Sequence, residues 1–218
     1  MPEHANNSLP AFPDSLNTLN EAMSFASSRT TFEIKKARLY NDGKDEGEVY
    51  LVALRGTNRS FDRTDVLGLH VVLMSGLSKS NIYYEEVKKT MTDTIPEGAK
   101  VVLIGHSLGG MIAQQIGADA DINAKYDVLD VVAIGSPFVK TEGRTCPLHR
   151  FADKADLVPW LGRAFKANFK TAKPVFISNG YFGRPVLAHT DSYRKSESWT
   201  VYDCFGEFNG KHTIVFAE

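Results

Sequence analysis

A serine between two glycines is the residue of this sequence with the clearest chemical potential. Residues 105–109 read Gly105-His106-Ser107-Leu108-Gly109 and fit the pattern G-x-S-x-G. The glycines allow a tight, strained turn that lifts the serine hydroxyl out of the sheet surface. A helix starting there directs its N-terminal amides at an anion formed on an attacked carbonyl. The segment predicts a nucleophilic serine, and a serine that merely caps a helix is the alternative.

Such a serine needs a general base, because its hydroxyl is a weak nucleophile at neutral pH, and the base needs a carboxylate that fixes its tautomer. Where this motif joins a strand to a helix, the order along the chain is serine, acid, histidine. The histidines that follow Ser107 are His149, His189 and His212. His212 is the weakest of these as a base, because Asp203 and Glu207 are the only acids near it that precede it.

The positions of nearby acids relative to the predicted strands decide which of the other two histidines, His149 or His189, can be the base. The acids before His149 include Asp127 and Asp130, which lie at the entry of a strand and therefore at the wrong edge of a parallel sheet. Asp153 and Asp156 follow a strand, at the edge where the serine turn must also lie. His189 comes next, in a predicted loop. We therefore predict His189 as the base, Asp153 or Asp156 as its acid, and a structural role for His149.

The elements that must position these groups form a strand, a turn, a helix and a second strand. Residues 100–104 are a β-branched run typical of a buried parallel strand. The turn at 105–110 leads into a helix that extends to about residue 118, and residues 128–134 are the next buried strand. This order predicts a βαβ unit and a parallel sheet.

The rest of the chain extends the same class of fold. Helical spacing covers residues 14–26, after a cap at Asp14, and residues 81–94. Residues 32–40 and 48–54 predict a hairpin whose turn at 41–43 continues as a loop through residue 47. Further strands are expected at 148–152, 175–178 and 213–216, and residues 58–80 show a mixed pattern without an assignment. We predict one α/β domain over residues 1–218, with a single, mostly parallel central sheet flanked by helices.

Composition excludes several classes of function. The 218 residues carry a net charge of −1, so no general field favours nucleic acid. Cys146 and Cys204 are predicted to be free thiols, and no His, Cys or Asp cluster has metal-ligand spacing, so no cofactor or metal is expected. Neither a signal peptide nor a spanning segment is visible. The location stays open, as cytoplasmic or exported by a signal-independent route.

Four motifs in order resemble the class 3 lipases, the fungal-type triacylglycerol lipase family. They are Leu54-Arg55-Gly56-Thr57, the serine segment extended to Gly110, Asp156-Leu157-Val158-Pro159, and His189 ahead of a Tyr and a Trp. The resemblance spans residues 49–199, and it implies an α/β-hydrolase fold.

The resemblance also assigns roles to single residues. Ser107 would be the nucleophile, His189 the general base, and Asp156, which stands just before the Val-Pro step, the orienting acid in preference to Asp153. The backbone N–H groups of Thr57 and Leu108 would form the oxyanion hole. Without the resemblance, Gly-Thr after a strand is equally ordinary turn chemistry.

The activity that the resemblance implies is hydrolysis of acyl esters of lipids, by a lipase or esterase acting through an acyl-enzyme. Residues 58–80 occupy the place of the family's lid, and the segments around Asp156 are short for the family. The expected partners are a lipid or small-molecule ester and, transiently, a lipid surface. A phospholipase or lysophospholipase is the alternative enzyme, and a binding or signalling protein of hydrolase fold is the non-catalytic alternative. The oligomeric state stays open.

Overall fold

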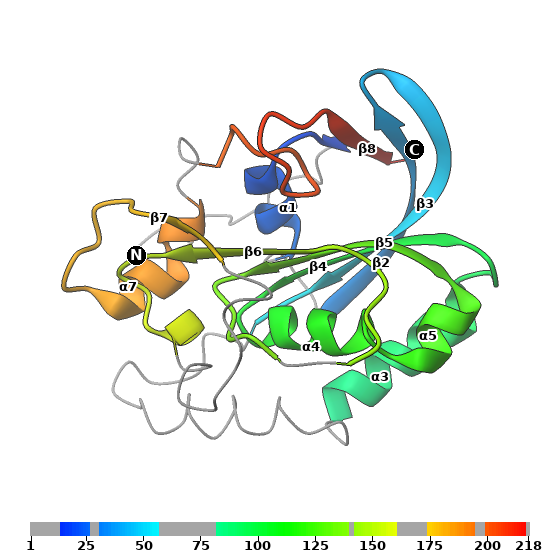
Figure 1. The fold of residues 1–218 in the computed structure, drawn as a ribbon, viewed down its shortest axis with the longest axis horizontal. Coiled ribbons are helices and arrows are strands. Elements are labelled where there is room, and N and C mark those ends of the chain that lie inside the picture. The colour runs from blue at the N-terminus through cyan, green and yellow to red at the C-terminus, as the bar shows by residue number, and fades with distance from the viewer. Residues whose placement is uncertain are drawn as a thin grey trace, which may run out of the picture.

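A central sheet organises the protein in the computed structural model, which describes residues 14–26, 31–56, 82–139, 142–160, 174–194 and 199–216. Across these residues the strand order is β1-β8-β2-β3-β4-β5-β6-β7 (Figure 1). The strands are β1 (Ser15–Leu16), β2 (Phe32–Asn41), β3 (Lys44–Leu54), β4 (Lys100–His106), β5 (Asp127–Ile134), β6 (Leu148–Asp153), β7 (Val175–Ile177) and β8 (His212–Phe216). The helices are α1 (Leu19–Ala26), α3 (Ile82–Thr94), α4 (Leu108–Ile116), α5 (Ala120–Lys125) and α7 (Pro185–Thr190), followed by the 3-10 turn η1 (Ser192–Arg194).

The sheet has two halves with different pairing. From β3 to β7 all neighbours are parallel, whereas β1, β8, β2 and β3 pair antiparallel. Because parallel strands point the same way, the carboxyl ends of β4, β5 and β6 lie along one edge, where ligands bind in open α/β sheets. The predicted α/β class with a mostly parallel sheet is confirmed.

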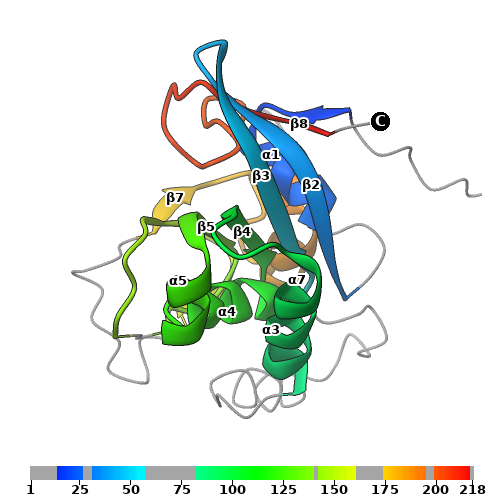
Figure 2. The ribbon, with the colours of Figure 1, turned by 90° about the vertical axis from the view of Figure 1, so that its right-hand side faces the viewer.

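Helices cover both faces of the parallel half, which explains its uninterrupted apolar strands. Figures 1 and 2 show α3, α4 and α5 on one side of the sheet and α1 on the other. Val102 and Ile104 of β4 face the core under α1, and Val101 and Leu103 face the core under α3 and α4. A strand buried on both faces carries no polar alternation.

Most predicted elements are confirmed, and two boundaries are wrong. The helix does not begin at Asp14: Ser15 and Leu16 pair with β8, and α1 starts at Leu19. Its start is a capping box, because the Glu21 carboxylate accepts hydrogen bonds from the N–H groups of Asn17 and Thr18 while the Thr18 hydroxyl accepts one from the N–H of Glu21.

The second wrong boundary is in the hairpin. The loop predicted through residue 47 is already strand, because β3 begins at Lys44 and pairs directly with Asn41. The tight turn is made possible by positive φ angles at Asp42 and Gly43.

Some expectations lie outside the described residues or stay predictions. The lid proposed at 58–80 belongs to the part of the chain that the structure does not describe. The single domain over residues 1–218 stays a prediction. The free thiols are confirmed, since Cys146 and Cys204 are unpaired. In the described helices, no stretch has the length and apolar character required to cross a membrane.

Candidate functional site

Ser107 lies on a strained turn between β4 and α4. Its φ of 54° and ψ of −121° are rare for a residue other than glycine. The turn is secured by a hydrogen bond of 2.9 Å from the N–H of Ser107 to the carbonyl of Ile134 at the end of β5. Strain of this kind persists only where the surrounding structure enforces it, and it places the serine at the carboxyl edge of the sheet.

The glycines of the motif allow α4 to approach the sheet closely. A Cβ on Gly105 would lie 2.4 Å from the backbone of Gly109, and a Cβ on Gly109 would lie 2.1 Å from the carbonyl oxygen of Leu54. Neither contact is sterically permitted. The close approach of backbones therefore requires glycine at both positions, as the sequence motif predicts.

The predicted base and acid lie next to Ser107. Nε2 of His189 is 2.8 Å from Oγ of Ser107, and Nδ1 of His189 is 2.9 Å from Oδ2 of Asp156. A carboxylate only accepts hydrogen bonds, so Nδ1 carries the proton and Nε2 is free to accept one from the serine hydroxyl. The side chain of Asp156 is fully buried and that of His189 is 14% exposed.

His189 lies in α7, which corrects the prediction that it lies in a loop. Pro185 at the start of this helix is a favoured first-turn residue, because its fixed φ suits a helix and its missing N–H needs no partner. His189 is in the last turn of α7. A ring held by a helix has fewer orientations than one on an open loop.

The two candidate acids have separate roles. Oδ1 of Asp156 accepts the N–H of Val158 at 2.9 Å, and Oδ2 accepts both His189 and the hydroxyl of Tyr193. Asp153 instead accepts the N–H groups of Ala155 and Asn179 and the hydroxyl of Ser192. The structure thus brings Asp156 to the histidine, whereas Asp153 fixes the loop after β7 against η1.

Two neighbours of His189 were not predicted as part of this site. His106 stacks on the His189 ring with centroids 5.0 Å apart, and its Nε2 is 3.2 Å from the His189 carbonyl oxygen. Tyr193 packs edge-on against both rings. The position of His106 inside the motif was a local signal. Tyr193 is the tyrosine that follows His189 in the fourth motif, but no contact with Asp156 was predicted for it.

The predicted oxyanion donors are only partly described. Leu108 is the first residue of α4, so its N–H has no acceptor within the helix. Thr57 lies outside the described residues. Its neighbour Gly56 lies against the serine turn, because a Cβ there would be 2.9 Å from Cβ of Ser107.

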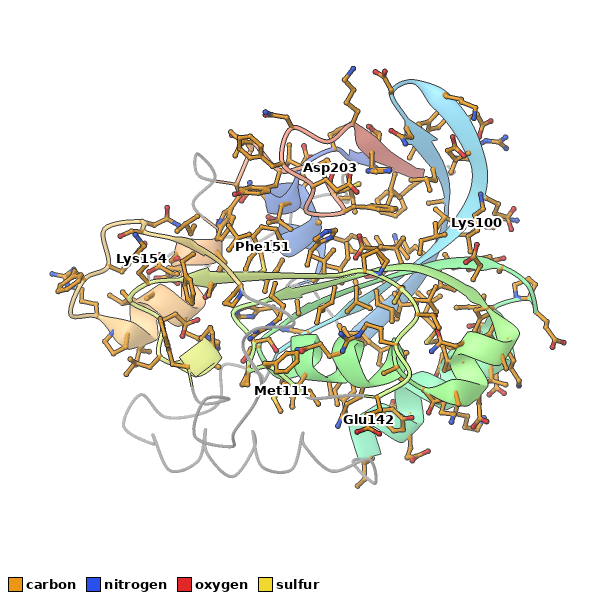
Figure 3. All side chains as sticks on the ribbon, viewed as in Figure 1. Lys100, Met111, Glu142, Phe151, Lys154 and Asp203 are labelled. Atoms are coloured by element: carbon orange, nitrogen blue, oxygen red, sulfur yellow. The ribbon has the colours of Figure 1, made fainter. Side chains whose placement is uncertain are left out.

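Apolar side chains pack on α4 next to the serine turn, and others near the proposed acid and base in the sequence are exposed. Met111, Val139 and Val158 form a small buried cluster against Leu108, and Leu157, Phe182 and Val186 are exposed. Figure 3 shows Met111 on α4 and Phe151 on the opposite face of the sheet, so this cluster is separate from the core under α1.

The other two downstream histidines pair with carboxylates instead of with Ser107. His149 donates to Asp130 at 2.9 Å, and this hydrogen bond raises the pKa of His149 above its ordinary value. The predicted structural role of His149 agrees with this pairing. His212 pairs with Asp203 at 2.8 Å. Figure 3 shows Asp203 beside β8, away from α4.

A group with metal-ligating atoms exists among the described residues, although the sequence spacing did not indicate one. Ligand atoms of Asp203, Glu207 and His212 lie within 4.8 Å of one another. Both oxygens of Asp203 already accept hydrogen bonds, Oδ1 from backbone N–H groups of the following turn and Oδ2 from the N–H and the ring of His212. These hydrogen bonds hold the turn before β8 in place.

Comparison with known proteins gives a family and a distant structural neighbour. Residues 24–208 match a family model described as "Alpha/beta hydrolase family". A solved structure titled "Crystal structure of M37 lipase" is 16% identical, with a TM-score of 0.34 over 59% of this chain and 55% of that chain. A search of the curated proteins returned no match.

Proposed function

Because the chain belongs to the alpha/beta hydrolase family, we propose that it is a serine hydrolase of carboxylic esters, with Ser107 as nucleophile, His189 as general base and acid, and Asp156 as orienting acid. The observation that carries this proposal is the unbroken chain of two hydrogen bonds, 2.8 Å from serine to imidazole and 2.9 Å from imidazole to carboxylate. Nucleophile, base and orienting group in this relation are the signature of covalent catalysis by serine.

The proposed reaction has two halves. Nε2 of His189 takes the hydroxyl proton as Oγ of Ser107 bonds to the ester carbonyl carbon, and the buried carboxylate of Asp156 stabilises the imidazolium. The imidazolium then gives that proton to the departing alkoxide, which leaves as an alcohol and an acyl-enzyme. Water then gives a proton to Nε2 of His189 as its oxygen bonds to the acyl carbon. The bond between Oγ and the acyl carbon breaks, the imidazolium returns the proton to Oγ of Ser107, and the carboxylic acid leaves.

Backbone amides would hold the negative oxygen of each tetrahedral intermediate. The N–H of Leu108 is one proposed donor, and the N–H of Thr57 is the other. The contact between Gly56 and Ser107 supports this choice, because it brings the chain that leads to Thr57 up to the nucleophile. Loss of one such donor costs about 2.7–4 kcal/mol of transition-state stabilisation.

For the substrate, we propose acyl esters of lipids, in line with the resemblance to class 3 lipases. The exposed apolar groups Leu157, Phe182 and Val186 support an apolar acyl chain and transient contact with a lipid surface. A panel of p-nitrophenyl esters of graded chain length, assayed with and without detergent micelles, tests this directly. Hydrolysis of phosphatidylcholine in preference to these esters would instead identify a phospholipase or lysophospholipase.

Covalent labelling tests the nucleophile itself. A fluorophosphonate should label the wild type, and labelling should disappear in Ser107→Ala. Ser24→Ala, which changes an exposed serine of α1, is the matched control and should label like the wild type. Labelling that persists in Ser107→Ala would refute the assignment. A folded protein that binds lipid esters but is never labelled would be the non-catalytic alternative.

A further inference from the structure

The hydroxyl of Tyr193 connects the end of β6 to the proposed acid. It accepts a hydrogen bond of 3.0 Å from the N–H of Asp153 and lies 2.5 Å from Oδ2 of Asp156. The N–H of Asp153 can only donate, and an ionised carboxylate can only accept. The single hydroxyl proton of Tyr193 must therefore point at Asp156, at the same oxygen that accepts Nδ1–H of His189.

The ring of Tyr193 is held so that this direction cannot change. The residue is fully buried, and its ring stacks on Trp199 with centroids 6.1 Å apart and makes an edge contact with His106 with centroids 5.5 Å apart. The backbone of Gly135 also crosses close by, because a Cβ there would lie 2.8 Å from the tyrosine ring. A hydroxyl on a ring enclosed from several sides acts as a fixed donor.

We propose that Tyr193 is a positioning residue that fixes the carboxylate of Asp156 and, by sharing the oxygen used by His189, sets the basicity of the imidazole. This inference rests on the proposed function. A hydrogen bond to a carboxylate stabilises its negative charge, so the carboxylate attracts the proton of its neighbour less strongly. Tyr193 thus weakens the pull of Asp156 on the Nδ1 proton of His189, because both donors share Oδ2 of that carboxylate.

The surroundings of Tyr193 keep its hydroxyl protonated, so that it can donate to Asp156. Burial, followed by the nearby charge of Asp156, raises the pKa of Tyr193 well above its ordinary value, so the hydroxyl keeps its proton. In the described part of the chain, the titratable groups in contact with this hydroxyl or with His189 include Asp156, His106 and, through its backbone N–H, Asp153.

Tyr193→Phe removes the hydroxyl and keeps the ring. We expect kcat to fall about tenfold, the scale of one hydrogen bond to a charged group. The acid limb of the pH profile of kcat/KM should move to higher pH, because the unshared carboxylate of Asp156 favours the imidazolium. Tyr126→Phe is the matched control: it deletes a buried hydroxyl that donates to the Met91 carbonyl, on the opposite face of the sheet, and both readouts should stay at wild-type values.

A double-mutant cycle separates positioning from general damage to the fold. The rate of fluorophosphonate labelling is measured in wild type, Tyr193→Phe, Asp156→Asn and the double variant. If the hydroxyl acts through Asp156, its removal slows labelling about tenfold in the wild-type background but less than about twofold in Asp156→Asn. Equal losses in both backgrounds, or an unshifted acid limb, would overturn the inference.

The outcomes also separate this inference from the proposed function. A wild type that is neither labelled nor active overturns the proposed function and the inference with it. A labelled wild type with an unaffected Tyr193→Phe overturns only the inference. Should Tyr193→Phe fail to fold, uniform replacement of tyrosine by 3-fluorotyrosine supplies a more acidic, stronger donor. It should move the acid limb to lower pH, and an unmoved limb would contradict the assignment.

Discussion

Gly109→Ala should separate the serine turn from the strand that faces it. The added Cβ would lie 2.1 Å from the carbonyl oxygen of Leu54 and 2.5 Å from its carbon. Both are backbone atoms, so no side chain can rotate away. Because Cβ contacts shorter than 3.0 Å do not persist, α4 and β3 must move apart by about 1 Å. The turn at Ser107 would move with the helix.

The cost of this movement can be set against the gain from alanine. Overpacking of a closed core costs about 1–3 kcal/mol, whereas replacing a helical glycine with alanine returns at most about 1 kcal/mol. We therefore expect a net loss of about 1–2 kcal/mol in the free energy of unfolding. A nucleophile displaced by about 1 Å should turn over about 100-fold more slowly.

Urea unfolding and hydrolysis of a p-nitrophenyl ester measure the two effects. Gly98→Ala is the control: Gly98 has a φ of +80°, and a Cβ added there would meet nothing within 4 Å, so the substitution costs stability through the backbone alone. About 1–2 kcal/mol should be lost there without loss of turnover. If Gly109→Ala keeps wild-type stability and turnover, then the close packing of α4 on β3 is not what positions the serine.

Three further predictions concern single side chains. Asp156→Asn should slow ester hydrolysis about 10⁴-fold, while Asp153→Asn should mainly lower the unfolding temperature; reversed effects would make Asp153 the acid. The raised pKa of His149, caused by its hydrogen bond to Asp130, means that its stabilisation is full below about pH 6.5 and is lost as pH rises through the raised value. Unfolding free energies at pH 6 and pH 9 should therefore differ more in the wild type than in His149→Ala, and equal differences would argue against the pairing. Cys204 is fully buried and burial raises its thiol pKa, so a disulfide reagent at pH 8 should label it only after denaturation, and rapid labelling of the native thiol would contradict its burial.

Local signals predicted the centre of the fold well. The β-branched run of β4, the glycines of the turn and the apolar spacing of α4 all lie within about 20 consecutive residues, so each supports the others. The short helix α5 was missed although its cap was readable. Asp119 accepts hydrogen bonds from the N–H groups of Asp121 and Ile122, which is an ordinary N-cap.

One error arose where distant pairing decides the structure. Ser15 and Leu16 continue a helical pattern, yet they form a strand because Val215 and Ile214 lie opposite them. The sequence of residues 14–26 alone gives no sign that β8 will pair with them.

The same limit applied to the candidate site. Ser107 was predicted from its neighbours in sequence and His189 from its place relative to the predicted strands. The strands left both Asp153 and Asp156 as the acid, and only the resemblance to class 3 lipases favoured Asp156. The role of Tyr193 was not predicted, because its hydroxyl contacts Asp156, which lies far from it in the chain, and the residues around the tyrosine do not indicate this contact.

The place of β8 in the sheet has a consequence for synthesis of the chain. β8 lies between β1 and β2, yet it is made long after both, so during translation the edge of β2 exposes N–H and C=O groups that only the segment at 212–216 will cover. An uncovered edge of this kind can pair with another nascent chain. The antiparallel half of the sheet therefore closes late. Although the βαβ unit forms from contacts that are local in sequence, we expect the recovery of native protein to depend strongly on chaperones.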